Sequence, residues 1–398
     1  MNKPLNITER NAVLTKMAEL VADHQTAILK ANQIDLEDYT GDDISMRDRL
    51  KVDDTKISGM VKSLRELANA TDPLDVERFG FTHENGIQVS NRTAPFGTIL
   101  IIYESRPDVT IEAAGIAFKS GNKIFLKGGK ESLNSNLILV NLWHQALEDL
   151  GHATDWVIYL QFNRTETQAF LEKPTQKLDL IVPRGGEKLI AFVKQHATCP
   201  VIVSGRGNNF VFVDAEADLQ MALHIIINAK TTKISACNAL DKVLISKNLP
   251  RKQKFLQQLI QELKKSNVEI LTDHKLNGLE NTMPMKDESV WYEEFLDYKI
   301  VLGQVLDVEE AITFINKYGG GHSAAIVTAN NDTANTFMQS VDTAAVYHNA
   351  STRFTDGGQF GLGGELAIST DKLHQRGPIG LQHLVTNKWY VKGNGQTR

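Results

Sequence analysis

Cysteine, proline and long apolar runs are scarce in this chain of 398 residues, which has two cysteines and ten prolines. Cys199 and Cys237 are too few for a disulfide framework, and no apolar run suits a signal peptide or a bilayer span. No two histidines stand four apart with an acid between them, and Cys-x-x-Cys is absent, so no metal site is expected. The composition predicts a cytoplasmic protein that does not bind the membrane.

Blocks of like charge are also missing. The 43 basic and 48 acidic side chains give a formal charge of −5 and are spread along the chain. This distribution argues against nucleic acid as the main partner. An anionic ligand would therefore have to meet a few locally placed cations and backbone amides.

The length favours two domains, because 398 residues exceed the usual size of one hydrophobic core. Residues 1–70 have helical periodicity, with a second helix expected over 57–67. Residues 82–94 alternate in polarity around Asn85-Gly86, a turn signal, and predict a short hairpin or arm whose counterpart is 384–391.

Strand-length apolar runs alternate with helical patterns through the rest of the chain, and this alternation is typical of parallel sheets with crossover helices. The first series predicts strands at 98–103, 123–126, 157–160, 178–182, 201–203 and 210–213, with helices at 107–119, up to 150 and from 187. The second predicts strands at 243–245, 268–270, 299–302, 324–327 and 344–347, with helices at 251–265, 308–317 and 333–341. Without a Pro-rich linker, two doubly wound α/β domains are expected to pack closely around a cleft.

The most informative stretch is 346–364, which follows a strand and carries five glycines within eight residues. Such glycines allow backbone to approach a ligand, and the polar side chains beside them offer many donors and acceptors. These side chains are Asn349, Ser351, Thr352, Arg353 and Asp356. The alternative is an ordered surface loop.

Two strand-to-helix corners place glycine pairs beside cations, at Lys127-Gly128-Gly129-Lys130 and at Arg184-Gly185-Gly186. A helix N-terminus with a glycine and a cation can bind phosphate, and corners on one sheet together favour a dinucleotide site. Tight turns are the simpler interpretation of each. Glu104, Ser105 and Arg106 end another strand, where either a ligand-facing turn or a surface salt bridge is expected.

Cys237 lies in a polar stretch between a helix and a strand, so it is expected to be more accessible than Cys199. Lys230 and Lys233 would favour its thiolate, and small neighbours leave room for a substrate carbonyl. A small buried side chain is the alternative. His322 is a pocket residue or a structural histidine, and a Cys/His hydrolase using His322 or His348 is a competing function. A binding or scaffold protein is a third.

The chain resembles the glutamyl phosphate reductases of the aldehyde dehydrogenase superfamily. The resemblance covers nearly the whole chain and rests on 103–107, 128–131, 182–186, 228–231 with Cys237-Asn238, 349–363 and 376–381. It implies a cofactor-binding domain at 1–229 with an arm at about 82–94, and a catalytic domain at 230–348. Residues 349–398 would form a return segment that lines the cleft and completes the arm, and the arm would serve oligomerisation into a dimer or tetramer.

The resemblance also implies site residues and a reaction. Cys237 and Asn238 would be catalytic, and the cofactor NADPH would contact Lys127, Lys130, Arg184, Gly185, Gly186 and Glu294. The substrate would contact Ser105, Arg106, Asn349, Ser351, Thr352 and Arg353. The implied reaction is reduction of L-glutamyl 5-phosphate to glutamate 5-semialdehyde through a Cys237 thioester, the second step of proline biosynthesis. The Asn238 amide and the Cys237 backbone amide are the candidate oxyanion donors.

Some residues depart from the family pattern. Lys233-Ile234 replaces Arg-Pro, Ala324 replaces Asp after His-Ser, Lys127 replaces Arg, and Asp241 replaces Glu. A reductase acting on the acyl phosphate of another small acid, or another aldehyde dehydrogenase, is therefore the alternative within the class. The region 203–207 has no acid to activate water, which fits a thioester exchanged with phosphate. The acyl phosphate implies a separate glutamate 5-kinase, and a transient complex with that kinase is a further hypothesis.

Overall fold

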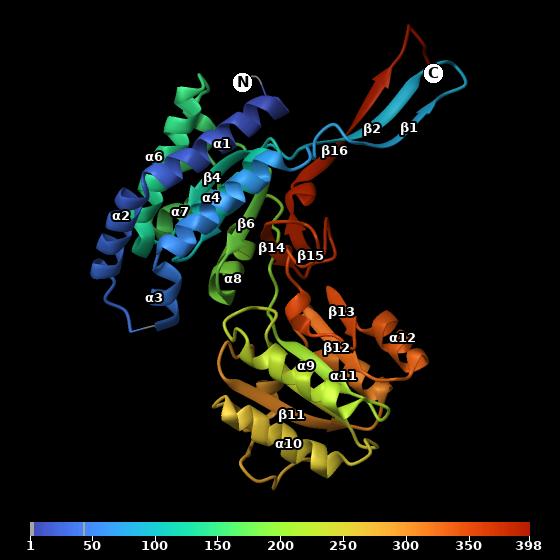
Figure 1. Cartoon of the computed structure of the whole chain (residues 1–398). Coiled ribbons are helices and arrows are strands. Elements are labelled where there is room, and N and C mark those ends of the chain that lie inside the picture. Colours follow the sequence, from blue (N-terminus) through green and yellow to red (C-terminus); the bar gives the residue numbers. More distant parts are fainter. Residues whose placement is uncertain (1–3, 43) are drawn as a thin grey trace. The chain divides into compact units, whose positions relative to one another are not determined.

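The computed structural model describes residues 4–42 and 44–398. The chain divides into two compact units (Figure 1). Unit 1 contains residues 1–203, 362–367 and 379–398, and unit 2 contains residues 204–361 and 368–378. Each unit has its own parallel sheet and its own hydrophobic clusters, which confirms the predicted α/β class with two doubly wound domains.

Unit 1 is built on four parallel strands in the order β5-β4-β3-β6. Their side chains are almost all apolar because both faces of the sheet are covered. The strands are β3 (Thr98–Tyr103), β4 (Lys123–Lys127), β5 (Val157–Tyr159) and β6 (Leu180–Arg184).

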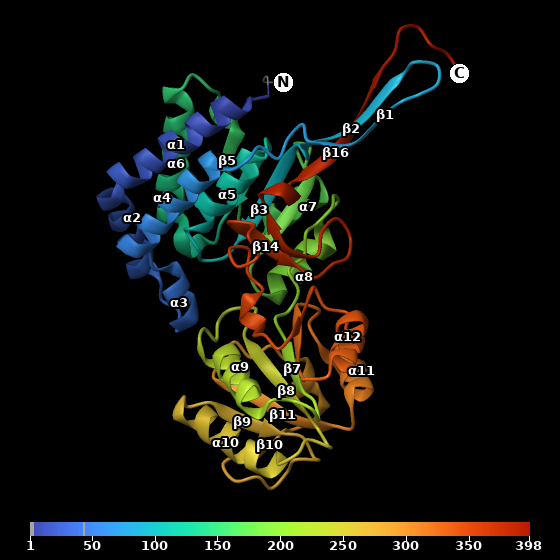
Figure 2. The ribbon, with the colours of Figure 1, turned by 45° about the vertical axis from the view of Figure 1, so that its right-hand side comes forward.

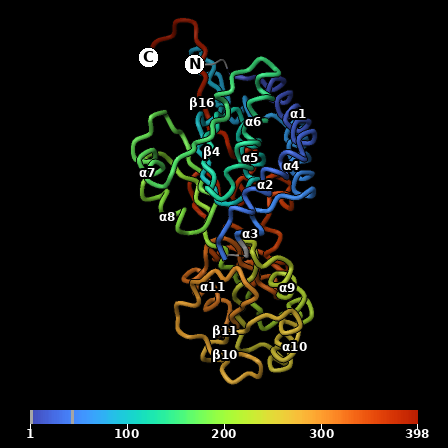
Figure 3. Tube along the Cα trace, turned by 90° about the vertical axis from the view of Figure 1, so that its left-hand side faces the viewer, coloured from blue at the N-terminus to red at the C-terminus, as the bar shows by residue number. Residues whose placement is uncertain are grey.

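Helices cover both faces of this sheet (Figure 3). On one face lie α5 (Val109–Lys119) and α6 (Leu133–Asp149). Outside them pack α1 (Ile7–Asp23), α2 (Gln25–Asp38) and α4 (Asp54–Asn69). The helix α3 (Ile44–Leu50) follows α2 in the chain. On the other face lie α7 (Arg164–Glu172), which the sequence pattern did not predict, and α8 (Glu187–His196). The short helices are η1 (Lys130–Ser132), η2 (Thr154–Trp156) and η5 (Leu381–His383).

The predicted arm is a three-stranded antiparallel sheet that extends away from the helices of unit 1 (Figure 2). It contains β1 (Glu77–Thr82), β2 (Gln88–Pro95) and β16 (Val385–Lys392). The Asn85-Gly86 turn joins β1 to β2, and Gly86 has a φ of 86° that an L side chain would strain. Phe79 and Trp389 are about half exposed and contact each other edge to face.

Unit 2 is built on seven strands in the order β10-β9-β11-β8-β7-β12-β13. All the pairs are parallel. The strands are β7 (Asn209–Val213), β8 (Leu240–Ser246), β9 (Glu269–Thr272), β10 (Met283–Pro284), β11 (Lys299–Val305), β12 (Ser323–Val327) and β13 (Ala345–His348). On one face lie α9 (Leu219–Thr231) and α10 (Lys252–Lys265); α11 (Val308–Tyr318), α12 (Asn331–Ser340) and η3 (Glu288–Tyr292) pack on the other (Figure 3). The short helix η4 (Thr352–Phe354) follows β13.

The division between the units differs from the predicted boundary at 229/230. β7 was expected to complete the first domain, but it hydrogen-bonds to β8 and β12 in the sheet of unit 2. An isolated apolar run does not reveal which sheet it joins, because pairing is set by long-range contacts. The expected strand at 201–203 is only a bridge from Val201 to Ile181. The return segment alternates between units, and its strands β14 (Glu365–Ser369) and β15 (Gly377–Gly380) form a two-stranded sheet.

Within the described ranges 4–42 and 44–398, no helix is long and apolar enough to cross a membrane. The same residues contain no group of three or more His, Cys, Asp or Glu side chains that could hold a metal ion.

Candidate functional site

Cys237 lies in the turn that enters β8, at the amino end of that strand. Gly207 and His322 stand just before the neighbouring parallel strands β7 and β12. Three turns therefore meet at one edge of the sheet in unit 2. Cys237 and Cys199 are both half-buried.

Asn209, the buried first residue of β7, ties these turns together. Its Nδ2 donates towards Gly207 O at 2.8 Å and towards Cys237 O and Ala239 O, both at 2.7 Å. Its Oδ1 accepts the Ser323 N–H at 3.0 Å. The backbone of Cys237 is thus fixed by a side chain that has no spare hydrogen-bonding capacity.

Gly207 touches the backbone of Cys237 so closely that no side chain fits. A Cβ on Gly207 would stand 2.0 Å from Cys237 O and 2.6 Å from its Cα. We therefore expect Gly207→Ala to displace Cys237, to lower activity by roughly 10²-fold and to cost about 1–3 kcal/mol of stability. Steady-state kinetics and thermal unfolding measure the two effects.

The matched control is Gly59→Ala on the exposed side of α4, where a Cβ meets nothing within 4 Å. Alanine has the higher helix propensity there, so this variant should keep full activity and unfold no earlier. Equal activity of Gly207→Ala and Gly59→Ala would contradict the close approach.

The Asn238 side chain secures the segment after β13. Its Nδ2 donates to Arg353 O at 3.2 Å and to Thr355 O at 3.0 Å, while Thr352 Oγ1 donates to Asn238 O at 2.9 Å. Both amide hydrogens are therefore used within the protein. The predicted role of this side chain as an oxyanion donor is not supported by these bonds, because an amide has only two N–H groups to donate.

Three other predicted substrate residues are also bonded within unit 2. Ser351 Oγ donates to Asn228 Oδ1 at 2.7 Å, and Thr352 is fully buried. Asn349 has a φ of 56°, and its amide accepts the Thr328 N–H at 3.0 Å and donates to Thr328 O at 2.9 Å. Thr328 follows the carboxyl end of β12, at the opposite edge of the sheet from Cys237. These side chains shape the segment rather than offer free groups to a ligand.

Arg353 differs from these neighbours. Its Nε and Nη1 are buried and have no hydrogen-bond partner. Burial lowers the pKa of the guanidinium, and the nearby Cys237 and Asp356 act in the opposite direction. A buried donor without an acceptor is costly, so unpaired groups of this kind commonly serve a ligand. Arg353 is thus a cation beside Cys237 with unused donors.

His322 is not arranged as the base of a Cys/His pair. It is fully buried, and burial lowers its pKa to about 4, so the ring is neutral. Its Nδ1 lies 2.8 Å from Ser323 Oγ, and its Nε2 has no partner. His348 Nε2 contacts Thr328 O at 3.0 Å. Neither of these bonds involves Cys237.

The two lysines expected to favour the thiolate are placed differently from that prediction. The Lys230 ammonium is buried and pairs with Asp241 Oδ1 at 3.0 Å. Lys233 is exposed. Arg353 is a cation whose charge interacts with Cys237. Glu294 lies half-buried in the irregular stretch between η3 and β11, also before the amino end of a strand.

In unit 1, the predicted corners follow three adjacent strands, β4, β3 and β6. Residues 104–106, 127–130 and 184–186 thus lie at the carboxyl ends of neighbouring parallel strands, where doubly wound sheets bind nucleotides. The expectation that the two glycine corners share one sheet is met.

The first corner combines cations with a buried carboxylate. Lys127 is half-buried, which lowers its pKa against the opposing effect of Glu131, and its Nζ donates to Gly128 O at 2.9 Å. Lys130 is exposed. Glu131 Oε2 is buried without a partner. The corner therefore offers both an anionic acceptor and cationic donors.

At the second corner, Gly186 caps α8 without a side-chain bond, and the Glu104 carboxylate accepts its N–H at 3.0 Å. A Cβ on Gly185 would overlap this carboxylate, whereas one on Gly186 would meet nothing within 4 Å. A carboxylate thus already uses the anion-binding amide of this helix terminus.

The third turn holds Ser105 and Arg106. Ser105 is buried, with a φ of 29° and a hydroxyl that has no hydrogen-bond partner. Arg106 Nη2 pairs with Asp108 Oδ2 at 2.9 Å, which matches the salt bridge weighed as the alternative. A strained serine with an unpaired buried hydroxyl is the more informative feature of the two.

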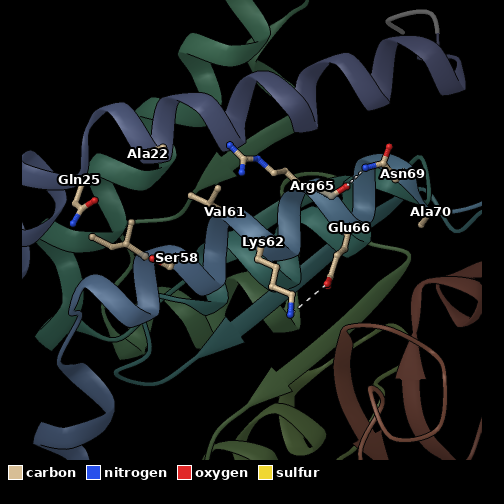
Figure 4. Close-up of a pocket in the computed structure, with 10 residues that line it drawn as sticks. Ala22, Gln25, Ser58, Val61, Lys62, Arg65, Glu66, Asn69 and Ala70 are labelled. Carbon is tan, nitrogen blue, oxygen red and sulfur yellow. Dashed lines mark hydrogen bonds and ion pairs between the residues drawn. The ribbon is translucent and has the colours of Figure 1, made fainter.

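A surface cavity of about 660 Å³ lies over α1 and α4, outside these corners (Figure 4). On its α4 side, Lys62 pairs with Glu66 at 3.7 Å. None of the predicted site residues lines it; the lining residues are Ala22, Gln25, Ile57, Ser58, Val61, Lys62, Arg65, Glu66, Asn69 and Ala70.

The sequence analysis did not predict the supporting roles of several residues, although it noted Asp241 as a replacement of Glu. Gly207 and Asn209 fix Cys237, and Asp241 and Lys242 hold the stretch around Glu294. Consecutive charges at the start of an apolar strand, Asp241-Lys242, were the one available signal, because charges are rarely buried without a purpose.

The whole chain is similar to known proteins. The model of the Aldehyde dehydrogenase family matches residues 3–277. A gamma-glutamyl phosphate reductase of Clostridium perfringens (strain 13 / Type A) is 41% identical over 392 residues, covering 98% of this chain and 94% of that protein. One of Aquifex aeolicus (strain VF5) is 41% identical over 408 residues, covering 99% and 92%.

Solved structures are also similar to this chain. The crystal structure of gamma-glutamyl phosphate reductase from Thermotoga maritima has a TM-score of 0.94 at 39% identity and covers 99% of this chain and 95% of that one. An engineered glycolyl-CoA reductase with bound NADP⁺ has a TM-score of 0.69 at 17% identity over 98% and 92%, and shows the fold alone. The chain therefore belongs to the gamma-glutamyl phosphate reductases, within the aldehyde dehydrogenase family.

Proposed function

We propose that this protein reduces L-glutamyl 5-phosphate to glutamate 5-semialdehyde and phosphate with NADPH, through a thioester on Cys237. The relatives named above support the activity. The observation that carries the mechanism is the buried, partly unpaired Arg353 guanidinium beside Cys237. It supplies positive charge where a thiolate, an acyl phosphate and an oxyanion would all need it.

The chemistry at Cys237 has two stages. The thiolate attacks the acyl carbon, a C–S bond forms, and the C–O bond to phosphate breaks with release of phosphate. Bound NADPH supplies a hydride to the thioester carbon. The resulting oxyanion collapses, the C–S bond breaks, and aldehyde leaves with regeneration of the thiolate. The hydrogen bond from Asn209 Nδ2 to Cys237 O keeps the Cys237 backbone fixed through both stages.

Arg353 is assigned to the anionic groups of this sequence. Its unpaired Nε–H and Nη1–H offer donors to the departing phosphate or to the oxyanion. A planar guanidinium suits a phosphate better than an ammonium does, because it donates along two parallel directions. Ser105, with its unpaired hydroxyl, remains a candidate for the substrate, and Ser351 and Thr352 hold the Arg353 segment in place.

The residues of unit 1 fit a nicotinamide dinucleotide. Gly186 leaves open space at the N-terminus of α8, and a pyrophosphate bound there would have to displace the Glu104 carboxylate from the Gly186 N–H. Glu131 offers an unpaired acceptor for ribose hydroxyl groups, and the exposed Lys130 offers a cation for a 2′-phosphate. We assign Lys127, Lys130 and 184–186 to the NADPH nucleotide on this basis, and Glu294 of unit 2 to the nicotinamide ribose.

The absence of a carboxylate from the segment 203–207 favours phosphate over water as the partner of the thioester. The segment 203–207 approaches Cys237 through Gly207 and contains no carboxylate. An aldehyde dehydrogenase that hydrolyses its thioester needs a general base to activate water. Phosphate is already nucleophilic, so the reversible exchange with phosphate requires no such base.

The experiment is the reverse reaction, in which the protein oxidises glutamate 5-semialdehyde with NADP⁺. NADPH formation should require inorganic phosphate, and arsenate should replace it. Equal rates with and without phosphate would overturn the proposed function. A panel of semialdehydes from other small acids separates this substrate from the alternative within the class.

Assembly and partners follow the same proposal. The exposed aromatic side chains on the arm suit a contact with further copies of the chain, as a dimer or tetramer. A cytoplasmic location and a transient complex with a glutamate 5-kinase remain predictions. Sedimentation of the protein alone and with that kinase tests the assembly and the complex.

A further inference from the structure

The backbone of residues 291–295, which contain Glu294, is held by side chains from β8 and from the segment before β7. Four hydrogen bonds anchor this backbone, at Trp291 O, Tyr292 O, Glu293 O and Phe295 N. The bonds are Asn208 Nδ2 to Trp291 O at 2.6 Å, Arg206 Nη1 to Tyr292 O at 3.0 Å, Lys242 Nζ to Glu293 O at 2.7 Å, and Phe295 N to Asp241 Oδ2 at 3.0 Å.

Asp241 and Lys242 both reach this stretch because β8 is irregular at their position. Asn209 pairs with Leu240, but Phe210 pairs with Lys242, so Asp241 is the extra residue of a bulge. Consecutive residues of a regular strand point to opposite faces, whereas a bulge redirects one of them. The two residues flank Glu294 with one bond on each side.

The two anchors from β8, Asp241 and Lys242, are buried charged groups, and so is the neighbouring Lys230. Lys230, Asp241 and Lys242 are at most 1% exposed. Asp241 is shared between Lys230, at 3.0 Å, and the Phe295 N–H. Lys242 stands 3.7 Å from the centre of the Phe295 ring, a cation–π contact. Burying three charged groups is expensive, so this cluster calls for a function.

The cluster has two cations and one anion. The charged groups that face Lys242 are Asp241 of β8, Lys230 of α9, Glu293 of the held stretch and Lys299 of β11. Burial is the main cause that lowers the pKa of Lys242 to about 7. Its charge therefore changes near neutral pH.

We propose that Lys242, together with Asp241 and Lys230, is a positioning group that sets the placement of the Glu294 carboxylate and, through it, the affinity for the nicotinamide cofactor. The inference rests on the proposed function, in which Glu294 binds the nicotinamide ribose. Lys242 does not touch the cofactor in this scheme. It fixes the carbonyl before Glu294, and Asp241 fixes the amide after it.

The test measures NADPH affinity by fluorescence titration for Lys242→Met, Glu294→Gln and the double variant. Lys242→Met should weaken binding by about tenfold, the scale of one charge-assisted hydrogen bond. If Lys242 acts through Glu294, the double variant should bind no more weakly than Glu294→Gln alone. Additive losses would overturn the inference.

The pH profile is a second readout. A charged Lys242 donates the stronger bond to Glu293 O and contacts the Phe295 ring as a cation. Wild-type affinity should therefore fall as pH rises through about 7, and this component should be missing from Lys242→Met. Titration of the cofactor phosphate is common to both proteins and cancels in the comparison. Identical profiles would contradict the proposal.

Lys119→Met is the matched control. Lys119 is also fully buried and donates to a backbone carbonyl, Ala68 O, at 3.2 Å, but it lies in α5 of unit 1. Its loss should lower the melting temperature without changing NADPH affinity. If Lys242→Met does not fold, Lys242→Gln keeps a donor to Glu293 O but does not titrate, so its affinity should not follow the wild-type pH profile.

Failure of the proposed function is distinguishable from failure of this inference. If the wild-type protein binds NADPH but oxidises glutamate 5-semialdehyde without phosphate, the proposed function is wrong. The coupling of Lys242 to Glu294 can still be measured in that case. Phosphate-dependent activity with an unchanged NADPH affinity in Lys242→Met overturns the inference alone.

Discussion

Cys237→Ser is expected to lower the rate of phosphate-dependent semialdehyde oxidation by at least about 10⁴-fold, the scale of losing the nucleophile of a covalent mechanism. A serine hydroxyl is not ionised near neutral pH, and the bonds of His322 and His348 go to Ser323 and Thr328 rather than to residue 237. NADPH affinity should change little, because the groups assigned to its nucleotide lie in unit 1.

Cys199→Ser is the control for this prediction. Cys199 is likewise half-buried, and burial raises the pKa of its thiol, so it should react slowly with a mild alkylating agent. The variant should keep wild-type kinetics, and alkylation of wild-type protein should stop turnover as Cys237 is modified. Appreciable activity in Cys237→Ser would exclude the thioester.

The sequence predicted the class of fold and most of the individual elements because local signals determine them. The periodicity of residues 1–70, the Asn85-Gly86 turn and the apolar strand runs other than 201–203 correspond to elements of the structure. The assignment of β7 failed because four of its five residues are apolar, and such a run could be buried in either sheet. Its partners β8 and β12 are distant from β7 in the sequence, and no local sequence pattern predicts which strands pair with it.

Which residues lie near Cys237 was only partly predictable. The run 346–364 was expected to supply ligand contacts as a group, but spacing cannot show how its hydrogen bonds are divided. The structure uses Asn349, Ser351 and Thr352 internally and leaves donors of Arg353 unpaired. The Asn238 amide was predicted to donate to an oxyanion, but its Nδ2 donates to the carbonyl groups of Arg353 and Thr355 instead.

Arg353→Met should lower kcat/KM for phosphate-dependent semialdehyde oxidation by about 10²-fold, since a buried charge-assisted hydrogen bond contributes about 1.5–3 kcal/mol. Methionine keeps much of the apolar stem and removes both the charge and the donors. If Arg353 binds phosphate, the KM for phosphate should rise. If it instead stabilises only the oxyanion, kcat should fall at unchanged KM.

Two further variants separate charge from geometry at this position. Arg353→Lys keeps the charge but loses the planar pair of donors, so it should recover part of the activity and leave the phosphate KM raised. Arg251→Met is the control, because Arg251 is exposed and follows the carboxyl end of β8, at the opposite edge of the sheet from Cys237. Arg353→Met with the kinetics of Arg251→Met would show that the unpaired guanidinium serves neither phosphate nor oxyanion, and that the charge beside Cys237 is structural.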